Sequence, residues 1–397
     1  MEKVSVAGVR LAAIEAGVRY QNRRDLVLIE LAQGAQTAGV FTLNAFCAAP
    51  VTLARQHLRK ASPRYLLINT GNANAGTGAR GLADARACCD AVARECGVEP
   101  EQVLPFSTGV IGEPLPVDTI VVGIPSAHAA LANDTFAEAA TGIMTTDTRP
   151  KLVSRSLLVS GEKVTIAGIA KGAGMIKPNM ATMLAYVFTD ATLSAPTLDR
   201  LLRSGVNKSF NRITVDGDTS TNDCCLLTAT GQSAATVEDE AGVCDSAFEA
   251  ALEEVLRELA IEVIRDAEGA TKFVTVEVSG GATSDECLRV GYAVAESPLV
   301  KTALFASDPN WGRILAAIGR AGLQELDIDS VQVRLGDTLI VANGCRAETY
   351  TEAAGQAEMD KRDITIAISL ARGECAETLF TADLSHDYVS INADYRS

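Results

Sequence analysis

The chain has 397 residues, of which 47% are apolar, 21% are charged and 5% are aromatic. These values are typical of a globular protein that is long enough for two or three domains. The formal net charge of −15 argues against general binding to nucleic acids or anionic membranes, because both would repel the protein. We therefore expect a soluble, acidic, globular protein.

No targeting segment is expected, because residues 1–8 lack the order of a secretory signal and no apolar run is long enough to span a membrane. The ten cysteines form no CxxC pair and the chain has three histidines, so neither disulfides nor a metal site are predicted. Cys88, Cys89 and Cys96 share one face of a predicted helix, where free cysteine packs as a small apolar residue. These features favour a reducing cytoplasm.

Strands and helices alternate along the chain, which predicts an α+β fold. Short apolar runs bounded by turn residues predict strands, and apolar residues three and four apart predict helices. In chain order we expect strands at 26–31 and 65–68, a helix at about 81–96, a strand at 183–188, a helix at 247–264, and strands at 274–278, 331–335 and 364–368.

Two helix starts and one linker are also expected. Ser297-Pro298 and Asp308-Pro309 each place a capping side chain before a proline, which is typical of a helix N-terminus. The loop at 279–284 is rich in glycine and small polar residues and is the best candidate for a linker.

Gly76-Thr77-Gly78-Ala79-Arg80-Gly81 fits the GxGxxG pattern of dinucleotide-binding proteins. In that motif the first glycine almost ends the strand, which brings the pyrophosphate to the helix N-terminus. Here residues 69–75 intervene, and no second strand ends in an acidic residue about twenty residues later. A glycine-rich loop is the better interpretation.

Three further segments are explained by local structure when each is considered alone. Ser107-Thr108-Gly109 fits a junction between a strand and a turn. The acidic loop at 215–223 superficially resembles a calcium loop, but residue 227 is leucine where an EF-hand needs glutamate. Thr182 alone is a β-branched residue at a strand start.

Taken together, these segments resemble the ornithine acetyltransferase (glutamate N-acetyltransferase) family of arginine biosynthesis. They follow the family order over nearly the whole chain. The matching segments are 69–74, 107–109, 171–184, 215–223, 268–272, 308–313 and 391–395.

The resemblance implies a layered α/β sandwich of the self-processing aminopeptidase and ornithine acetyltransferase type, with a smaller C-terminal α+β domain. It also implies that the precursor breaks between Ala181 and Thr182. Cleavage there gives an alpha chain of residues 1–181 and a beta chain of residues 182–397. Residues 182–280 are then expected to complete the main sandwich, and residues 281–397 to form the smaller domain.

The resemblance further implies that Thr182 carries acetyl from N2-acetyl-L-ornithine to L-glutamate in a ping-pong reaction. A newly freed α-amino group has an unperturbed pKa of about 7.7 to 8.0, so cleavage would place nucleophile and base on one residue. Thr108 and Gly109 are implied as donors to the oxyanion. The implied substrate-binding residues are Thr145, Lys171, Thr182, Glu268, Asn392 and Ser397.

No cofactor is implied, and the partners are small amino-acid substrates rather than nucleic acid or membrane. Some family members also use acetyl-CoA as co-substrate to make N-acetylglutamate, and the sequence leaves this open. Two cleaved alpha and beta pairs commonly associate in the family, which implies a heterotetramer.

Two departures from the family pattern lie outside the nucleophile. Ser397 ends the chain where a threonine is common, and Cys224-Cys225 stands where a threonine is usual. Two other functions also stay open. One is a self-processing amidase or aminopeptidase that passes the acyl group to water, and the other is an uncleaved relative that only binds amino acids.

Overall fold

The structure, a computed structural model, describes residues 3–177 and 183–394. It divides into two compact units, each with its own apolar core. The first unit comprises residues 1–172, 177–211 and 219–263. The second comprises residues 173–176, 212–218 and 264–397.

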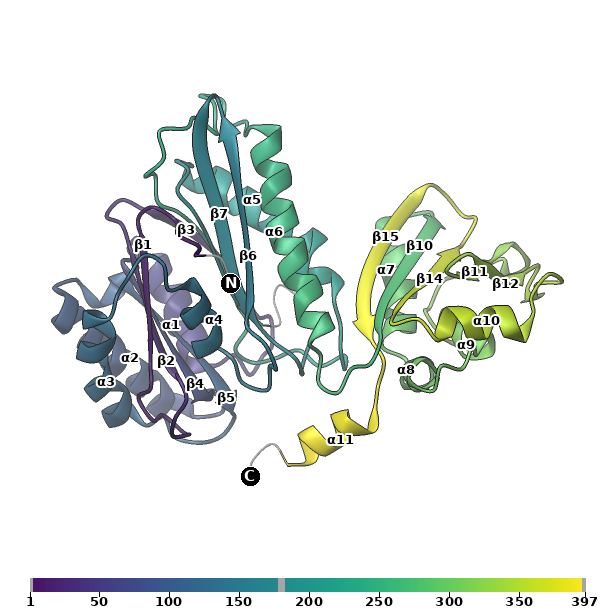
Figure 1. Ribbon diagram of the computed structural model, residues 1–397, viewed down its shortest axis with the longest axis horizontal. Helices are drawn as coiled ribbons and strands as arrows, with labels where there is room; N and C mark the ends of the chain where they lie inside the picture. Colours follow the sequence, from purple (N-terminus) through teal and green to yellow (C-terminus); the bar gives the residue numbers. More distant parts are fainter. Residues whose placement is uncertain (1–2, 178–182, 395–397) are drawn as a thin grey trace. The chain divides into compact units, whose positions relative to one another are not determined.

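The first unit is built on two β-sheets (Figure 1). The first sheet has the order β1 (Val9–Ile14), β2 (Leu26–Leu31), β4 (Tyr65–Asn72) and β5 (Val103–Val110). The second has the order β3 (Gln36–Phe41), β9 (Cys224–Ala229), β8 (Leu184–Thr189), β7 (Glu162–Lys171) and β6 (Lys151–Val159).

The two sheets pack face to face. Alternate side chains of each strand form one shared core, to which Ile68 of the first sheet and Ile169 of the second both belong. Phe106 and Tyr186 meet edge to face across this core, with ring centroids 5.4 Å apart. Strand β5 of the first sheet and strand β8 of the second therefore face each other across the core.

Helices cover the outer faces of both sheets, which makes the first unit a four-layer sandwich. The outer face of the first sheet packs on a second apolar cluster that contains Cys89 and Val92 of α2 and Ile124 of α3. On the second sheet, Gly168 has no room for a side chain, because its Cβ would lie 2.7 Å from Leu259 of α6. The helices of the first unit are α1 (Ala49–Leu58), α2 (Gly78–Cys96), α3 (Val117–Ala129), α4 (Phe136–Gly142), α5 (Ala195–Lys208) and α6 (Ser246–Arg265). Of these, α4 contributes Phe136 to the core between the sheets.

The second unit contains a six-stranded mixed sheet, in which β10 pairs parallel with β14 and antiparallel with β15. Val274, Val276 and Val278 alternate inward from β10 into the core. The strands are β10 (Phe273–Gly281), β11 (Gln332–Leu335), β12 (Thr338–Ala342), β13 (Cys345–Arg346), β14 (Asp363–Ser369) and β15 (Cys375–Ala382). The helices are α7 (Ser284–Ala295), α8 (Pro298–Phe305), α9 (Trp311–Gly319), α10 (Glu352–Met359) and α11 (His386–Ala393).

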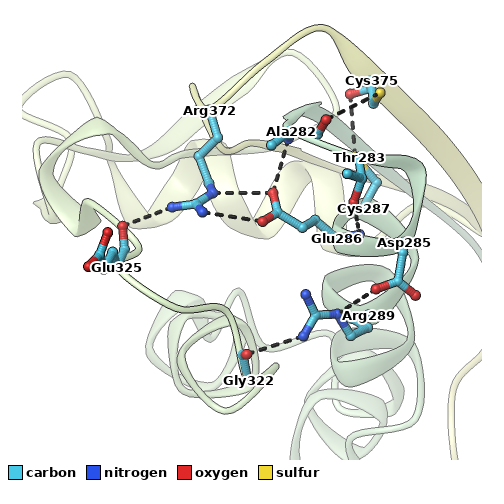
Figure 2. Close-up of polar contacts among 10 residues, drawn as sticks. All are labelled: Ala282, Thr283, Asp285, Glu286, Cys287, Arg289, Gly322, Glu325, Arg372 and Cys375. Carbon is cyan, nitrogen blue, oxygen red and sulfur yellow. Dashed lines mark hydrogen bonds and ion pairs between the residues drawn. The ribbon is translucent and has the colours of Figure 1, made fainter.

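The loop at 279–284, the linker candidate of the sequence, joins β10 to α7 inside the second unit (Figure 2). Thr283 caps α7 by accepting from the N–H of Glu286, and the Glu286 carboxylate accepts from the N–H of Ala282 at 3.0 Å. Arg372 binds both carboxylate oxygens of Glu286 at 3.2 Å. These contacts order the loop, and the second unit already begins at Ile264.

The predicted α+β class is confirmed, as are all the predicted strands and the helices at 81–96 and 247–264. Ser297 caps α8 as expected, by accepting from the N–H of Val300. The helix start at Asp308-Pro309 is wrong, because α9 begins at Trp311 and Asn310 provides its cap. No helix among the described residues is long and apolar enough to cross a membrane.

Candidate active site

Two parallel strands, β4 and β5, end together at the predicted oxyanion site. In their register Thr70 pairs with Thr108, and Gly71 pairs with Gly109. Gly109 has a φ of +134°, and a Cβ there would lie 2.3 Å from the carbonyl carbon of Gly71. Only glycine allows the two backbones to approach so closely. Glycine is thus required at position 109.

Lys171 reaches the same place from the other sheet. It is the last residue of β7, and its Nζ donates to Thr108 Oγ1 at 3.3 Å. The structure therefore brings two of the predicted site residues into contact. It also places a positive charge beside the predicted oxyanion donors, where negative charge would develop in acyl transfer.

A buried carboxylate, Asp147, connects the segments of Lys171 and Thr145. Its Oδ1 accepts from the N–H of Gly172 at 2.7 Å and from Lys151 Nζ at 2.6 Å, and its Oδ2 accepts from the N–H of Thr145 at 3.0 Å. The side chains of Asp147 and Lys151 are fully buried. Burial would raise the pKa of the Asp147 carboxyl, but the charges of Lys171 and Lys151 lower it to about 2. Asp147 is therefore ionised near neutral pH.

The main chain around Thr145 has a second support. The Arg23 guanidinium donates to the carbonyl of Met144 at 2.7 Å and to that of Thr145 at 2.8 Å. Arg23 and Asp147 together fix Thr145 through both its carbonyl and its N–H. Three of the predicted residues in the first unit, Thr108, Thr145 and Lys171, are thus joined by named contacts.

Buried amide side chains tie the motif segments to one another. The Asn222 amide donates to the carbonyls of Ala73 (2.6 Å) and Ser107 (2.9 Å). Ser107 Oγ in turn donates to Asn69 Oδ1 at 2.6 Å. These polar groups are buried and satisfied, which is how such networks specify one backbone arrangement. The motif segments 69–74, 107–109 and 215–223 therefore converge in space.

Asp223 is the next residue and is almost fully buried. Within the described residues, its Oδ2 has no hydrogen-bond partner. Burial raises the pKa of this carboxyl well above its usual value, although a hydrogen bond from Ser220 and the charge of Lys171 oppose the shift. The neighbouring N–H of Cys224 donates to the carbonyl of Met183 at 2.9 Å, so Asp223 lies close to the start of β8.

The second unit brings two further predicted residues together. The Asn392 amide donates to Glu268 Oε2 at 2.7 Å, and Glu268 is only 8% exposed. The N–H of Glu268 donates to the carbonyl of Ala173 at 2.9 Å. A Cβ on Gly174 would lie 2.4 Å from Glu268 Oε2, so the glycine makes room for the carboxylate.

Three predicted residues, Ala181, Thr182 and Ser397, lie outside the described residues. The cleavage site and the terminal carboxylate therefore stay predictions. The other predicted residues form one contact group in each unit, Thr108, Gly109, Thr145 and Lys171 in the first and Glu268 and Asn392 in the second. Among the described residues, no group of His, Cys, Asp and Glu side chains could hold a metal ion.

Sequence reasoning assigned no role to Asp147, Lys151 or Asp223. Asp147 and Lys151 are four residues apart, a spacing that indicates a contact only in a helix. Here Asp147 lies in a loop and Lys151 begins strand β6, so this spacing could not predict their pairing. Asp223 lies in the 215–223 segment that resembles the family. The only sign of its burial in the sequence is its position directly before an apolar strand, β9.

The chain is similar to known proteins over nearly its whole length. The ArgJ family matches residues 10–397. An arginine biosynthesis bifunctional protein ArgJ of Pseudomonas syringae pv. tomato is 58% identical over 393 residues, which are 99% of this chain and 97% of that protein. The protein of the same name from Psychrobacter arcticus is 57% identical over 394 residues, again 99% of this chain and 97% of that protein. A solved chain of ArgJ from Bacillus halodurans is 34% identical, with a TM-score of 0.49 over 51% of this chain and 95% of that chain. The chain therefore belongs to the ArgJ family.

Proposed function

We propose that the chain transfers acetyl from N2-acetyl-L-ornithine to L-glutamate through an acetyl ester on Thr182, after cutting itself between Ala181 and Thr182. Membership of the ArgJ family makes the chain a glutamate N-acetyltransferase of arginine biosynthesis. The residues that carry the reaction are our assignment. The observation that supports it best is the contact of Lys171 Nζ with Thr108 Oγ1 at the end of β5.

Self-cleavage starts when the Thr182 hydroxyl adds to the Ala181 carbonyl carbon. The peptide C–N bond then breaks, and the acyl group moves from nitrogen to oxygen as an ester. Water opens the ester, which leaves a carboxylate on Ala181 and a free amine and hydroxyl on Thr182.

In the first half of the transfer, the Thr182 amine takes the hydroxyl proton while the oxygen attacks the acetyl carbonyl of acetylornithine. Thr108 and Gly109 donate hydrogen bonds to the oxyanion. The acetyl C–N bond breaks, and the proton passes to the leaving ornithine amine. Thr182 then carries the acetyl group.

In the second half, the neutral α-amine of glutamate attacks the ester. The bond to Thr182 oxygen breaks, the amine proton returns to that oxygen, and N-acetylglutamate leaves. We assign Lys171 to a substrate carboxylate because it supplies the positive charge at this site. We assign Glu268, oriented by Asn392, to a substrate ammonium group because it supplies a nearly buried carboxylate.

The wider assignments are also proposals. Thr145 and the Ser397 carboxylate complete the binding site, no cofactor is needed, and acetyl-CoA serves as an alternative acetyl donor. Two cleaved alpha and beta pairs associate. The enzyme works in the cytoplasm, where its ten free cysteines would stay reduced.

The experiment is a denatured mass measurement followed by an exchange assay, with Thr182→Ala as control. We expect two fragments, one beginning at Thr182, and acetylglutamate formed in equal amount to the ornithine released. The variant should give one intact mass and no exchange. Acetate release without acetylglutamate would support the amidase alternative instead. A folded, intact wild-type chain would contradict the proposal and favour an amino-acid-binding protein.

A further inference from the structure

A carboxylate in the 215–223 loop binds the chain segment that leads toward the proposed cleavage bond. The main-chain N–H groups of Met175 and Ile176 donate to Asp216 Oδ2 at 2.6 Å and Oδ1 at 3.0 Å. The N–H of Val215 donates to the carbonyl of Ile176 at 2.7 Å. Ile176 precedes Ala181 by five residues. Asp216 thus fixes the conformation of the chain shortly before the bond.

The backbone of this segment needs such support. Met175 has a φ of +52°, in the left-handed region that is unfavourable for a residue with a side chain. Gly174, directly before it, is confined by the Glu268 carboxylate. A segment held in an unfavourable conformation relaxes when the groups that hold it are removed. The two hydrogen bonds to Asp216 therefore help to stabilise this conformation.

The C-terminal helix α11 contacts the same carboxylate. The hydroxyl of Tyr388 donates to Asp216 Oδ2 at 3.1 Å. Burial and the charge of Asp216 raise the pKa of Tyr388, so the hydroxyl keeps its proton and remains a donor. Asn392, one turn later in α11, donates to the carbonyl of Tyr388 at 2.9 Å and to Glu268. One helix therefore supports both Asp216 and Glu268.

We propose that Asp216 and Tyr388 are positioning residues for self-cleavage. The Tyr388 hydroxyl orients the Asp216 carboxylate, which fixes Met175 and Ile176 and so presents the Ala181–Thr182 bond for attack. The inference rests on the proposed function, because it requires cleavage at that bond. It also implies that docking of α11 speeds self-cleavage.

The test measures the cleavage rate of the full chain after a short pulse of cell-free synthesis, with fragments followed on denaturing gels. Tyr388→Phe removes only the hydroxyl, and Asp216→Asn removes the charge while it keeps the shape. Each should slow cleavage on the order of tenfold, as expected for loss of a hydrogen bond to a charged group. The double variant should be no slower than Asp216→Asn, because Tyr388 acts through Asp216.

Tyr350→Phe is the matched control. It removes a tyrosine hydroxyl that also binds a carboxylate at 3.1 Å in the second unit, but that carboxylate belongs to Glu352 and not to Asp216. It should cleave at the wild-type rate. Thermal midpoints are measured in the uncleavable Thr182→Ala background, where Tyr388→Phe and Tyr350→Phe should fall equally, by no more than about 4 °C.

The inference is overturned if wild type cleaves and Tyr388→Phe cleaves equally fast, or if Tyr350→Phe slows as much as Tyr388→Phe. It is also overturned if the double variant is much slower than Asp216→Asn, since the two residues would then act separately. A wild-type chain that does not cleave at Ala181–Thr182 contradicts the proposed function itself, and the inference with it.

Discussion

Asp147 accepts a hydrogen bond from the main-chain N–H of Gly172 at 2.7 Å, where β7 ends. The same carboxylate binds Lys151 and the N–H of Thr145. It therefore sets the spacing between two segments that carry proposed substrate-binding residues, Thr145 and Lys171. Such a carboxylate supports the site without contacting substrate, and its loss should affect both stability and binding.

Asp147→Asn should lower the stability of the first unit strongly. The change leaves Lys151 charged and buried with its partner carboxylate removed, and breaking a buried pair in this way costs about 3–5 kcal/mol. The measurement is the thermal midpoint in the Thr182→Ala background, so that all chains compared are intact.

The matched control is Asp199→Asn, which breaks an exposed pair with Arg203 at 2.7 Å. Exposed pairs contribute about 0–1 kcal/mol, so its midpoint should hardly move. Because the folded pKa of Asp147 lies at about 2, below its usual value, its contribution is complete above pH 4 and is lost as pH falls toward 2. Equal midpoints with and without Asp147→Asn in the Thr182→Ala background at pH 7 would contradict this account.

Asp223→Asn should gain stability relative to wild type as pH rises. Burial raises the folded pKa of Asp223, so the folded state binds more protons than the unfolded state between the two pKa values. Wild-type stability therefore falls with rising pH in that window, by up to about 1.4 kcal/mol per pH unit. The asparagine introduced by Asp223→Asn cannot titrate, so the stability of this variant does not fall for this reason in that window. Midpoints of both proteins at a series of pH values from 4 to 8 test the prediction, and two parallel curves would refute it.

Much of the fold follows from local patterns in the sequence. A short apolar run places β2, because this strand is buried on both faces. Alternation places β10 and apolar spacing places α6, because burial on one face dictates these periods. The start of α9 is different. Both Asp308 and Asn310 are capping residues, and only the hydrogen bond from the N–H of Arg313 to Asn310 Oδ1 decides between them.

The sequence predicts the motifs that form the site, but it does not predict the hydrogen bonds that join these motifs. The segments around Asn69, Ser107 and Asn222 are far apart in the chain, and single amide hydrogen bonds join them. Asp147 meets Gly172 across 25 residues, a relationship that depends on the pairing of β6 with β7. No local pattern encodes such contacts, since they exist only once the sheets have formed.

Gly109→Ala should disrupt the proposed oxyanion site. The new Cβ would lie 2.3 Å from the backbone of Gly71, so one of the two strand ends must move. Gly112→Ala is the control, because Gly112 also has a positive φ, +86°, but has no atom within 4 Å of the new Cβ. We expect a loss of about 1 kcal/mol in the control from backbone strain alone, and a larger loss with slowed cleavage for Gly109→Ala. Equal cleavage rates in the two variants would show that the close approach has no role.

Lys171→Met should weaken binding of acetylornithine more than it slows the chemical step. The ammonium group contacts Thr108 and is our assigned partner for the substrate carboxylate, and a hydrogen bond to a charged group contributes about 1.5–3 kcal/mol. KM should therefore rise on the order of 10- to 100-fold in cleaved enzyme. Lys208→Met removes an exposed lysine that pairs with Glu253 and should leave both constants unchanged. A fall in kcat at constant KM would instead assign Lys171 to the oxyanion, because such an interaction is made only in the transition state.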